Sequence, residues 1–225
     1  MGYFEELSVE QQNLIVRHLE LVIEANKTTN LTRIDTFEDG MLLHVEDSLV
    51  ALDEMNDAPE GLYGDLGTGA GYPGIPLAIA TGRKTTLVDA RKKKVLLLDS
   101  FTRDLGIDDY VSTYEGRAEL LAQKSKGTFS VLTARALSKL SVLLELASPL
   151  LSRGGILICY KAQVADEELA NAKRVGNLVG MTINSDRELK LSDKKTTRRI
   201  ITFKKINEPK MKLPRQEGMA QKKPL

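Results

Sequence analysis

A glycine-rich segment constrains the fold of this chain more than any other feature. Residues 64–74 read GDLGTGAGYPG, and they join a short apolar run to an apolar segment with helical spacing. Gly67, Gly69 and Gly71 let the backbone turn sharply and approach a ligand without a Cβ atom in the way. The segment therefore predicts a strand, a tight turn and a helix at the ligand-binding edge of a sheet.

Short apolar runs alternate with helical patterns from Gly61 onward, which is typical of βαβ units. The predicted strands are residues 62–66, 85–88, 111–114, 129–133, 155–160, 181–184 and 198–204. The predicted helices between them are residues 73–81, 92–105, 118–123, 138–151 and 164–179. No long helix separates the last two strands. The pattern predicts an α/β, Rossmann-like fold with a seven-stranded, mostly parallel sheet closed by an antiparallel hairpin.

The remaining segments predict a helical cap and a tail. Ser8 and Gln11 have the spacing of a capping box before a first amphipathic helix, and residues 38–52 predict a second helix that is broken at residues 56–61. We therefore divide the chain into a helical cap (1–60), a Rossmann-like cofactor-binding domain (61–206) and a basic, irregular C-terminal tail (207–225).

Composition excludes several classes of protein. With 42% hydrophobic and 28% charged residues, the chain is neither disordered nor fibrous, and its apolar runs are too short to cross a membrane. Acids near the N-terminus argue against an export signal, so we expect a cytoplasmic protein. The single cysteine, Cys159, lies in an apolar run and is expected to be a buried hydrophobe.

Two acids near the glycine segment indicate the kind of ligand. The spacing of the glycines departs from the dinucleotide pattern, and Asp65 stands where it would repel a pyrophosphate but could accept a hydrogen bond from a cationic amino-acid group. Asp89 ends the next strand, where it can accept the hydroxyl groups of a ribose. An adenosyl amino acid satisfies both acids. The alternative is that both are cap or turn residues, and a nicotinamide dehydrogenase is disfavoured.

Two further segments end strands at the same edge of the predicted sheet. Ala118 and Glu119 could meet an adenine ring and its amino group, although Glu119 could equally be a first-turn helix acid. Arg135 follows the fourth strand, where open α/β sheets place catalysis, and the alternative is a structural salt bridge.

Taken together, these segments resemble the RsmG (GidB) methyltransferase family along almost the whole chain. The matching pieces are Asn30-Leu31-Thr32, His44 with Asp47-Ser48, residues 64–76, residues 116–119, residues 133–136, Pro149-Leu150-Leu151 with Gly154-Gly155, Lys161, Leu213-Pro214-Arg215 and residues 222–225. Tyr72 stands where the family more often has Phe, Leu213 where it often has Tyr, and Ala162 where it has Gly after the lysine.

The resemblance implies a class I, S-adenosylmethionine-dependent enzyme that methylates N7 of guanosine 527 in bacterial 16S ribosomal RNA. It carries over Gly67, Tyr72, Ala118, Glu119 and Arg135 as cofactor contacts. With the acids and glycines above, the predicted cofactor site is Asp65, Gly67, Gly69, Gly71, Tyr72, Asp89, Ala118, Glu119 and Arg135.

Guanine N7 carries an in-plane lone pair, so its methylation needs positioning and no indispensable general base. Arg135 and His44 are the catalytic candidates, with no metal. A lone histidine in a helical pattern is more often a packing residue, but the family match favours His44 as a residue that lines the site. Asp47 and Ser48 are expected to orient it.

Basic residues near the predicted site are the candidates for RNA contacts. They are Arg117, Lys161, Arg198, Arg199, Arg215, Lys222 and Lys223. Because the net charge is only +1, we expect RNA that is presented in a ribosomal particle or its precursor rather than a long naked duplex. The resemblance implies 16S rRNA of the small ribosomal subunit as this partner, and we expect a monomer. The alternatives are a class I methyltransferase for another RNA or a small molecule, and a non-catalytic ribosome-binding module.

Overall fold

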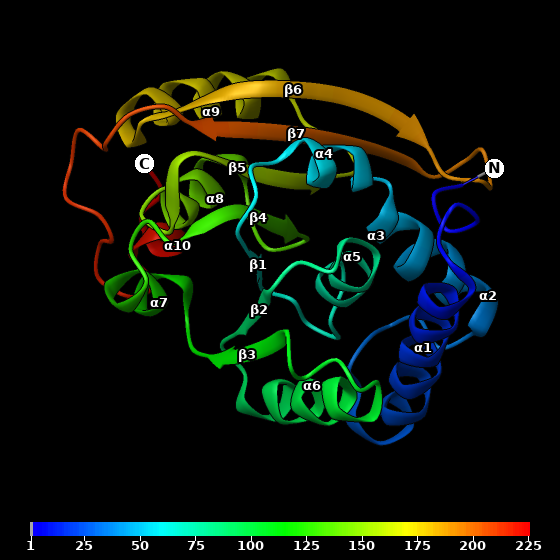
Figure 1. The fold of residues 1–225 in the computed structure, drawn as a ribbon. Coiled ribbons are helices and arrows are strands. Elements are labelled where there is room, and N and C mark those ends of the chain that lie inside the picture. Colours follow the sequence, from blue (N-terminus) through cyan, green and yellow to red (C-terminus); the bar gives the residue numbers. More distant parts are fainter. Residues whose placement is uncertain (1) are drawn as a thin grey trace.

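A seven-stranded sheet in the order β3-β2-β1-β4-β5-β7-β6 forms the centre of the computed structural model, which describes residues 2–225 (Figure 1). The first five strands are parallel: β1 (Leu62–Leu66), β2 (Thr85–Asp89), β3 (Val111–Glu115), β4 (Phe129–Arg135) and β5 (Leu151–Lys161). β7 (Thr197–Lys205) is antiparallel to β5, and β6 (Met181–Lys190) pairs antiparallel with β7 at the edge. The predicted fold class and closing hairpin are confirmed.

Helices cover both faces of the sheet. The cap helices, α5 (Gly74–Thr81) and α6 (Lys92–Asp104) pack on one face, while α7 (Ala118–Lys124), α8 (Leu140–Ala147) and α9 (Asp166–Val179) pack on the other (Figure 1). Side chains of β5 alternate accordingly, with Ile158 in the first core and Cys159 in the second. Cys159 is fully buried, as expected.

The cap begins with α1 (Val9–Thr29), and its predicted capping box is present: Gln11 N donates to Ser8 Oγ, and Ser8 N donates to Gln11 Oε1. Ile15 and Leu19 of α1 share one buried core with Leu77 and Leu87 of the sheet domain. The cap is thus continuous with the sheet domain in its packing.

The helix predicted over residues 38–52 is present over 37–49, but it is irregular. The segment is divided into α2 (Phe37–Gly40), a π-helical turn η1 (Met41–Glu46) and α3 (Asp47–Leu49), and α4 (Leu52–Asp57) follows. Carbonyls in this segment accept bonds from other elements: Leu43 O from Arg135, Ser48 O from the Tyr160 hydroxyl, and Val50 O from Arg187. Because these external donors compete with the helical i→i+4 ladder, the segment does not form one regular helix.

Three further boundaries differ from the prediction by four residues or more, and the first is the start of β5 at Leu151 rather than at residue 155. α8 ends at Ala147 rather than at residue 151, because Pro149 lacks the amide hydrogen that another helical turn would use. β6 runs to Lys190, beyond the predicted residue 184. Its exposure alternates along its length, since it is a half-exposed antiparallel edge strand whose polar residues hid it among the apolar runs.

The C-terminal tail is more ordered than predicted. α10 (Met219–Lys222) lies in it, and Ala220 is fully buried. Arg215 donates two hydrogen bonds of 2.6 Å to the buried carboxylate of Glu145 on α8, which anchors the segment. None of the helices formed by residues 2–225 has the length and apolarity needed to cross a membrane.

Candidate active site

The candidate site lies at the carboxyl edge of the central strands. β1 connects onward to β2 on one side, whereas β4 connects to β5 on the other, so the strand order reverses between β1 and β4. Open α/β sheets bind ligands at such a point. The glycine loop, Asp89, Ala118 and Arg135 follow or end β1, β2, β3 and β4, and all are therefore at this edge.

Within the loop, the three glycines have different surroundings. Gly67, Gly69 and Gly71 have φ angles of 72°, 63° and 95°, all in the region that favours glycine. A Cβ atom would lie 2.7 Å from Leu137 at Gly67 and 2.7 Å from Ile75 at Gly71, but at Gly69 its nearest neighbour would be Lys94 Nζ at 3.6 Å. Gly67 and Gly71 are thus required by packing, and the backbone at Gly69 is open to a ligand.

Asp65 is fully buried and holds the loop from inside. Its Oδ1 accepts a hydrogen bond of 2.7 Å from the Thr133 hydroxyl on β4, and its Oδ2 accepts one of 3.0 Å from Gly74 N at the start of α5. Burial raises the pKa of this carboxyl group. The carboxylate joins β1, β4 and α5. Its two hydrogen bonds therefore fix the shape of the glycine loop.

Asp89 supports the open glycine. Its Oδ2 accepts from Gly69 N at 3.2 Å and its Oδ1 accepts from Arg91 N at 2.8 Å. The loop is also tied to β2 through Val88 O, which accepts from Gly67 N and Thr68 N. The carboxylate retains lone pairs for further donors, as a ribose acceptor requires.

Glu119 is buried, and the C-terminal segment satisfies it. Its Oε1 accepts from Gly218 N at 2.9 Å, while the neighbouring Arg117 contacts Glu217 at 3.4 Å and Gln221 at 3.2 Å. Ala118, also buried, begins α7 beside it. The tail thus forms one wall next to the edge where β3 ends.

Tyr72 lies at the centre of an aromatic stack. Its ring is 4.4 Å from the parallel ring of His44 and 4.5 Å from the ring of His18, and the Arg135 guanidinium lies 5.7 Å from its centroid. The Tyr72 hydroxyl is buried without a partner among the residues described. The predicted site residues of the cap (His44), the loop (Tyr72) and β4 (Arg135) are therefore brought together.

Both histidines are held neutral. Burial, with the positive charge of Arg135 as the next cause, lowers the pKa of His44 to about 3, and burial lowers the pKa of His18 to about 3. Arg135 donates toward His44 Nδ1 at 3.5 Å, so we assign the proton to Nε2, which lies 3.2 Å from the Thr32 hydroxyl. The lone pair of His44 faces a cation, which makes the ring a poor general base.

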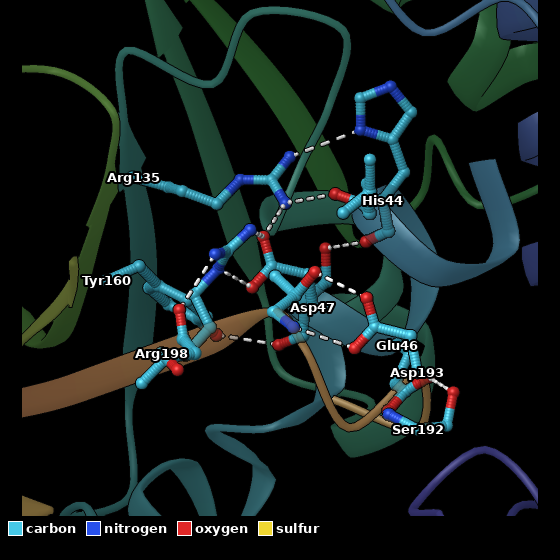
Figure 2. Close-up of polar contacts among 12 residues, drawn as sticks. His44, Glu46, Asp47, Arg135, Tyr160, Ser192, Asp193 and Arg198 are labelled. Carbon is cyan, nitrogen blue, oxygen red and sulfur yellow. Dashed lines mark hydrogen bonds and ion pairs between the residues drawn. The ribbon is translucent and has the colours of Figure 1, made fainter. Parts of the chain in front are cut away.

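Asp47 fixes the arginine of the site. Figure 2 shows its carboxylate between two guanidinium groups: Arg135 donates to Oδ2 at 2.9 Å, and Arg198 on β7 donates to Oδ1 at 2.6 Å. The expectation that Asp47 orients His44 is wrong, because Arg135 and Thr32 contact the ring instead. Ser48 donates to the main-chain oxygen of His44.

Most predicted RNA contacts are balanced within the chain. Lys161 pairs with Glu168 at 2.8 Å, Arg198 with Asp47, Arg199 with Asp186 at 2.7 Å, and Arg215 with Glu145. Arg117 is half-exposed beside Glu217. Lys222 and Lys223 are exposed and have no salt bridge within residues 2–225.

Sequence reasoning missed three contributors to the site. His18 stacks on Tyr72 from α1, and a single histidine within an apolar helix gave no signal for this role. Thr32 was identified only as part of a family motif. The basic run Arg91 to Lys94 follows Asp89 directly, and its position beside the glycine loop could have been read from the sequence. Among the described residues no cluster of potential ligands could hold a metal ion.

A family model and the curated relatives agree on one family. The model of the GidB family, described as rRNA small subunit methyltransferase G, matches residues 11–210. A protein of Lactobacillus johnsonii named ribosomal RNA small subunit methyltransferase G is 36% identical over 99% of this chain and 95% of its own length. A protein of the same name from Listeria monocytogenes is 32% identical over 98% of this chain and 93% of its own length.

Solved structures share the fold at low sequence identity. A geranyl diphosphate methyltransferase in complex with SAM is 14% identical, has a TM-score of 0.56, and matches 72% of this chain and 86% of its own. The [4+2]-cyclase SpnF is 15% identical with a TM-score of 0.55, matching 72% of this chain and 81% of its own. A cyclase and a methyltransferase therefore share this fold, which does not by itself assign the reaction.

Proposed function

The chain belongs to the GidB family of rRNA small subunit methyltransferases, and from this premise we propose that it transfers a methyl group from S-adenosylmethionine to N7 of guanosine 527 in 16S rRNA. The observation that carries the proposal is the position of Arg135, which lies at the end of β4 over Tyr72 and beside the glycine loop. Neither histidine serves it as a general base, because burial lowers the pKa of each to about 3 and the His44 Nδ1 lone pair faces Arg135.

The residues of the edge fit S-adenosylmethionine. The open backbone at Gly69 provides the close approach, and the carboxylate of Asp89 provides a ribose acceptor next to it. The negative field of Asp65 and Asp89 suits a cationic sulfonium ligand and opposes a pyrophosphate. We propose Asp65, Gly67, Gly69, Gly71, Tyr72, Asp89, Ala118, Glu119 and Arg135 as the residues that form the cofactor site.

When bound, the cofactor supplies an electrophilic methyl group on sulfur. The protein then has to orient the guanine so that N7 points along the line of that bond, because N7 already has a free lone pair. Arg135, held by Asp47 and Leu43 O, is placed to donate to the guanine edge or an adjacent phosphate. His44 and Tyr72 form the wall that keeps Arg135 in place.

Methyl transfer tests this proposal. Labelled methyl groups from S-adenosylmethionine are offered to small ribosomal subunits and, in parallel, to bare 16S rRNA, and the product is located by cleavage at N7-methylguanine. We expect one labelled guanine, and a rate that is flat from pH 6 to pH 8, because no group in the site needs to lose a proton in that range. Label at another atom or nucleotide would refute the proposed specificity.

The proposal extends to the partner and the setting of the enzyme. We propose that 16S rRNA within the small subunit or its precursor is the substrate and that the chain acts as a cytoplasmic monomer. Lys222 and Lys223 remain candidates for phosphate contacts, and so does Arg117, whose pair with Glu217 is half-exposed. Lys161, Arg198, Arg199 and Arg215 would have to leave more buried carboxylate pairs first. Light scattering that gave a dimer mass would contradict the monomer.

A further inference from the structure

A basic hollow lies beside the glycine loop, between α1 and α6. Arg91, Lys92, Lys93 and Lys94 line a cavity of about 650 Å³ together with Thr28 to Leu31 at the end of α1. A second cavity of about 780 Å³, which shares Asn30 and Leu31 with the first, continues the hollow toward Lys27 and Arg33. Figure 1 shows α1 and α6 next to each other at this side of the molecule.

The charge of the hollow is one-sided. Six basic residues line its two cavities, and Asp35 is the one acid among the lining residues. In the described part of the chain, Arg91, Lys92, Lys93 and Lys94 make no salt bridge, in contrast to Arg198, Arg199 and Arg215. Because the whole chain carries a net charge of only +1, this local excess distinguishes the hollow from the average surface.

The basic run Arg91 to Lys94 also stands at a position where cations destabilise the folded chain. Arg91 is the N-cap of α6, and the first turn of this helix holds Lys92, Lys93 and Lys94 but no acid. The partial positive charge of a helix N-terminus repels cations, so stability would favour acids here. A polyanion that binds at this point would remove both the repulsion between the side chains and the conflict with the helix dipole.

The hollow is connected to the candidate active site. Lys94 Nζ is the atom nearest to the open side of Gly69, and the Thr32 hydroxyl that follows Asn30 and Leu31 contacts His44. A strand whose nucleotide is bound at the site would thus have this basic surface within reach of its adjacent phosphates. Leu96 is 58% exposed at the same place, which offers an apolar contact to a ribose or base.

We propose that this basic hollow is a binding surface for the phosphates of the rRNA strand that carries the target guanine. The inference rests on the proposed function, because it takes rRNA as the substrate. Lys92 and Lys93 are exposed and bind phosphates from the solvent side, while Lys94 approaches the strand next to the cofactor loop.

The test compares two double variants of equal charge change. Lys92→Gln/Lys93→Gln removes two cations from the hollow and leaves Lys94 intact. Lys84→Gln/Lys126→Gln removes two exposed lysines that precede β2 and β4, at the opposite edge of the sheet. Thermal unfolding and titration with S-adenosylmethionine verify that both variants fold and bind cofactor as the wild type does.

Binding to bare 16S rRNA and to small subunits is then measured as a function of salt. We expect Lys92→Gln/Lys93→Gln to weaken binding about tenfold and to reduce the slope of log K against log salt by about 1.5, while the control retains the wild-type values. Equal binding by both variants and the wild type would overturn the inference. Methyl transfer by the wild type is scored separately, so a failure of the proposed function is distinguishable from a failure of the hollow.

Discussion

At the scale of single residues, Gly69 differs from the other loop glycines in a way that matters for function. The loop needs Gly67 and Gly71 so that Leu137, Ile75 and His18 can pack, whereas the space beyond Gly69 is open. Glycine spacing alone indicates a ligand-binding turn, but it cannot tell which glycine faces the ligand. That distinction depends on side chains from α1, α5 and the segment after β4.

Replacing Gly69 by Asn should impair the cofactor site with little effect on the fold. Asn tolerates the left-handed backbone, and its side chain would fill the space that a ligand needs. We expect the affinity for S-adenosylmethionine to fall at least about tenfold, or about 1.4 kcal/mol, by titration calorimetry. Gly82→Asn is the matched control: φ is 65° there and no heavy atom lies within 4 Å of the added Cβ. Equal losses in both variants would mean that backbone strain, rather than a blocked site, is responsible.

At the scale of elements, the contacts that complete the site come from segments far apart in the chain. Asp47 of the cap holds Arg135 of β4 and Arg198 of β7, and Tyr160 of β5 donates to Ser48 O. Arg135, a catalytic candidate in the sequence, and Arg198, a candidate RNA contact, are therefore partly buried connections between elements. No local sequence pattern shows that both arginines pair with Asp47, which lies far from them in the chain.

The sequence predicted the elements with a local signal well and the others poorly. The presence of the seven strands and of the capping box at Ser8 was predicted correctly, although β5 and β6 are longer than predicted, because periodicity and capping are local properties. The π-helical turn within the predicted helix 38–52 was not, since donors to this segment, Arg135, Tyr160 and Arg187, lie on other elements. The same reason explains the ordered tail: Arg215 and Gly218 find buried partners on α8 and α7.

The Arg215–Glu145 pair predicts that the C-terminal segment contributes to stability. Arg215→Ala leaves the Glu145 carboxylate, which is 2% exposed, without its partner, and we expect the free energy of unfolding to fall by about 3 kcal/mol in urea denaturation. Replacing both residues by Leu should recover much of this loss, because no buried charge remains unpaired. Arg17→Ala breaks an exposed pair with Glu20 and should cost no more than about 0.5 kcal/mol. A similar small effect at Arg215 would show that the tail contributes little to stability.

At the scale of the whole molecule, cap and sheet domain form one cooperative unit, because α1 and the first face of the sheet share a core. The chain contains only two histidines, and both lie in that shared region with the pKa lowered to about 3 by burial. Between pH 3 and pH 6.5, the unfolded chain therefore binds protons that the folded chain does not.

This difference predicts a loss of stability in mild acid. The contribution of each neutral histidine is complete above pH 6.5 and decreases as the pH falls, by about 2 kcal/mol per histidine between pH 7 and pH 5. Urea denaturation at both pH values measures it. His18→Gln, which can still donate to Ala70 O, should reduce the pH dependence by about half. An unchanged pH dependence in His18→Gln would mean that other groups cause the loss of stability. The raised pKa of Asp65 is not one of them, because it stabilises the folded chain as the pH falls.

The buried thiol in the middle of β5 makes local opening of the native protein measurable. Cys159 is the one cysteine of the chain, it is inaccessible, and burial raises the pKa of its thiol to about 12. An alkylating reagent can reach it only when the core between β5 and the helices α8 and α9 opens, because the thiol is buried in that core. Its rate of labelling in native buffer therefore reports how often this core opens, and the measurement needs no engineered cysteine.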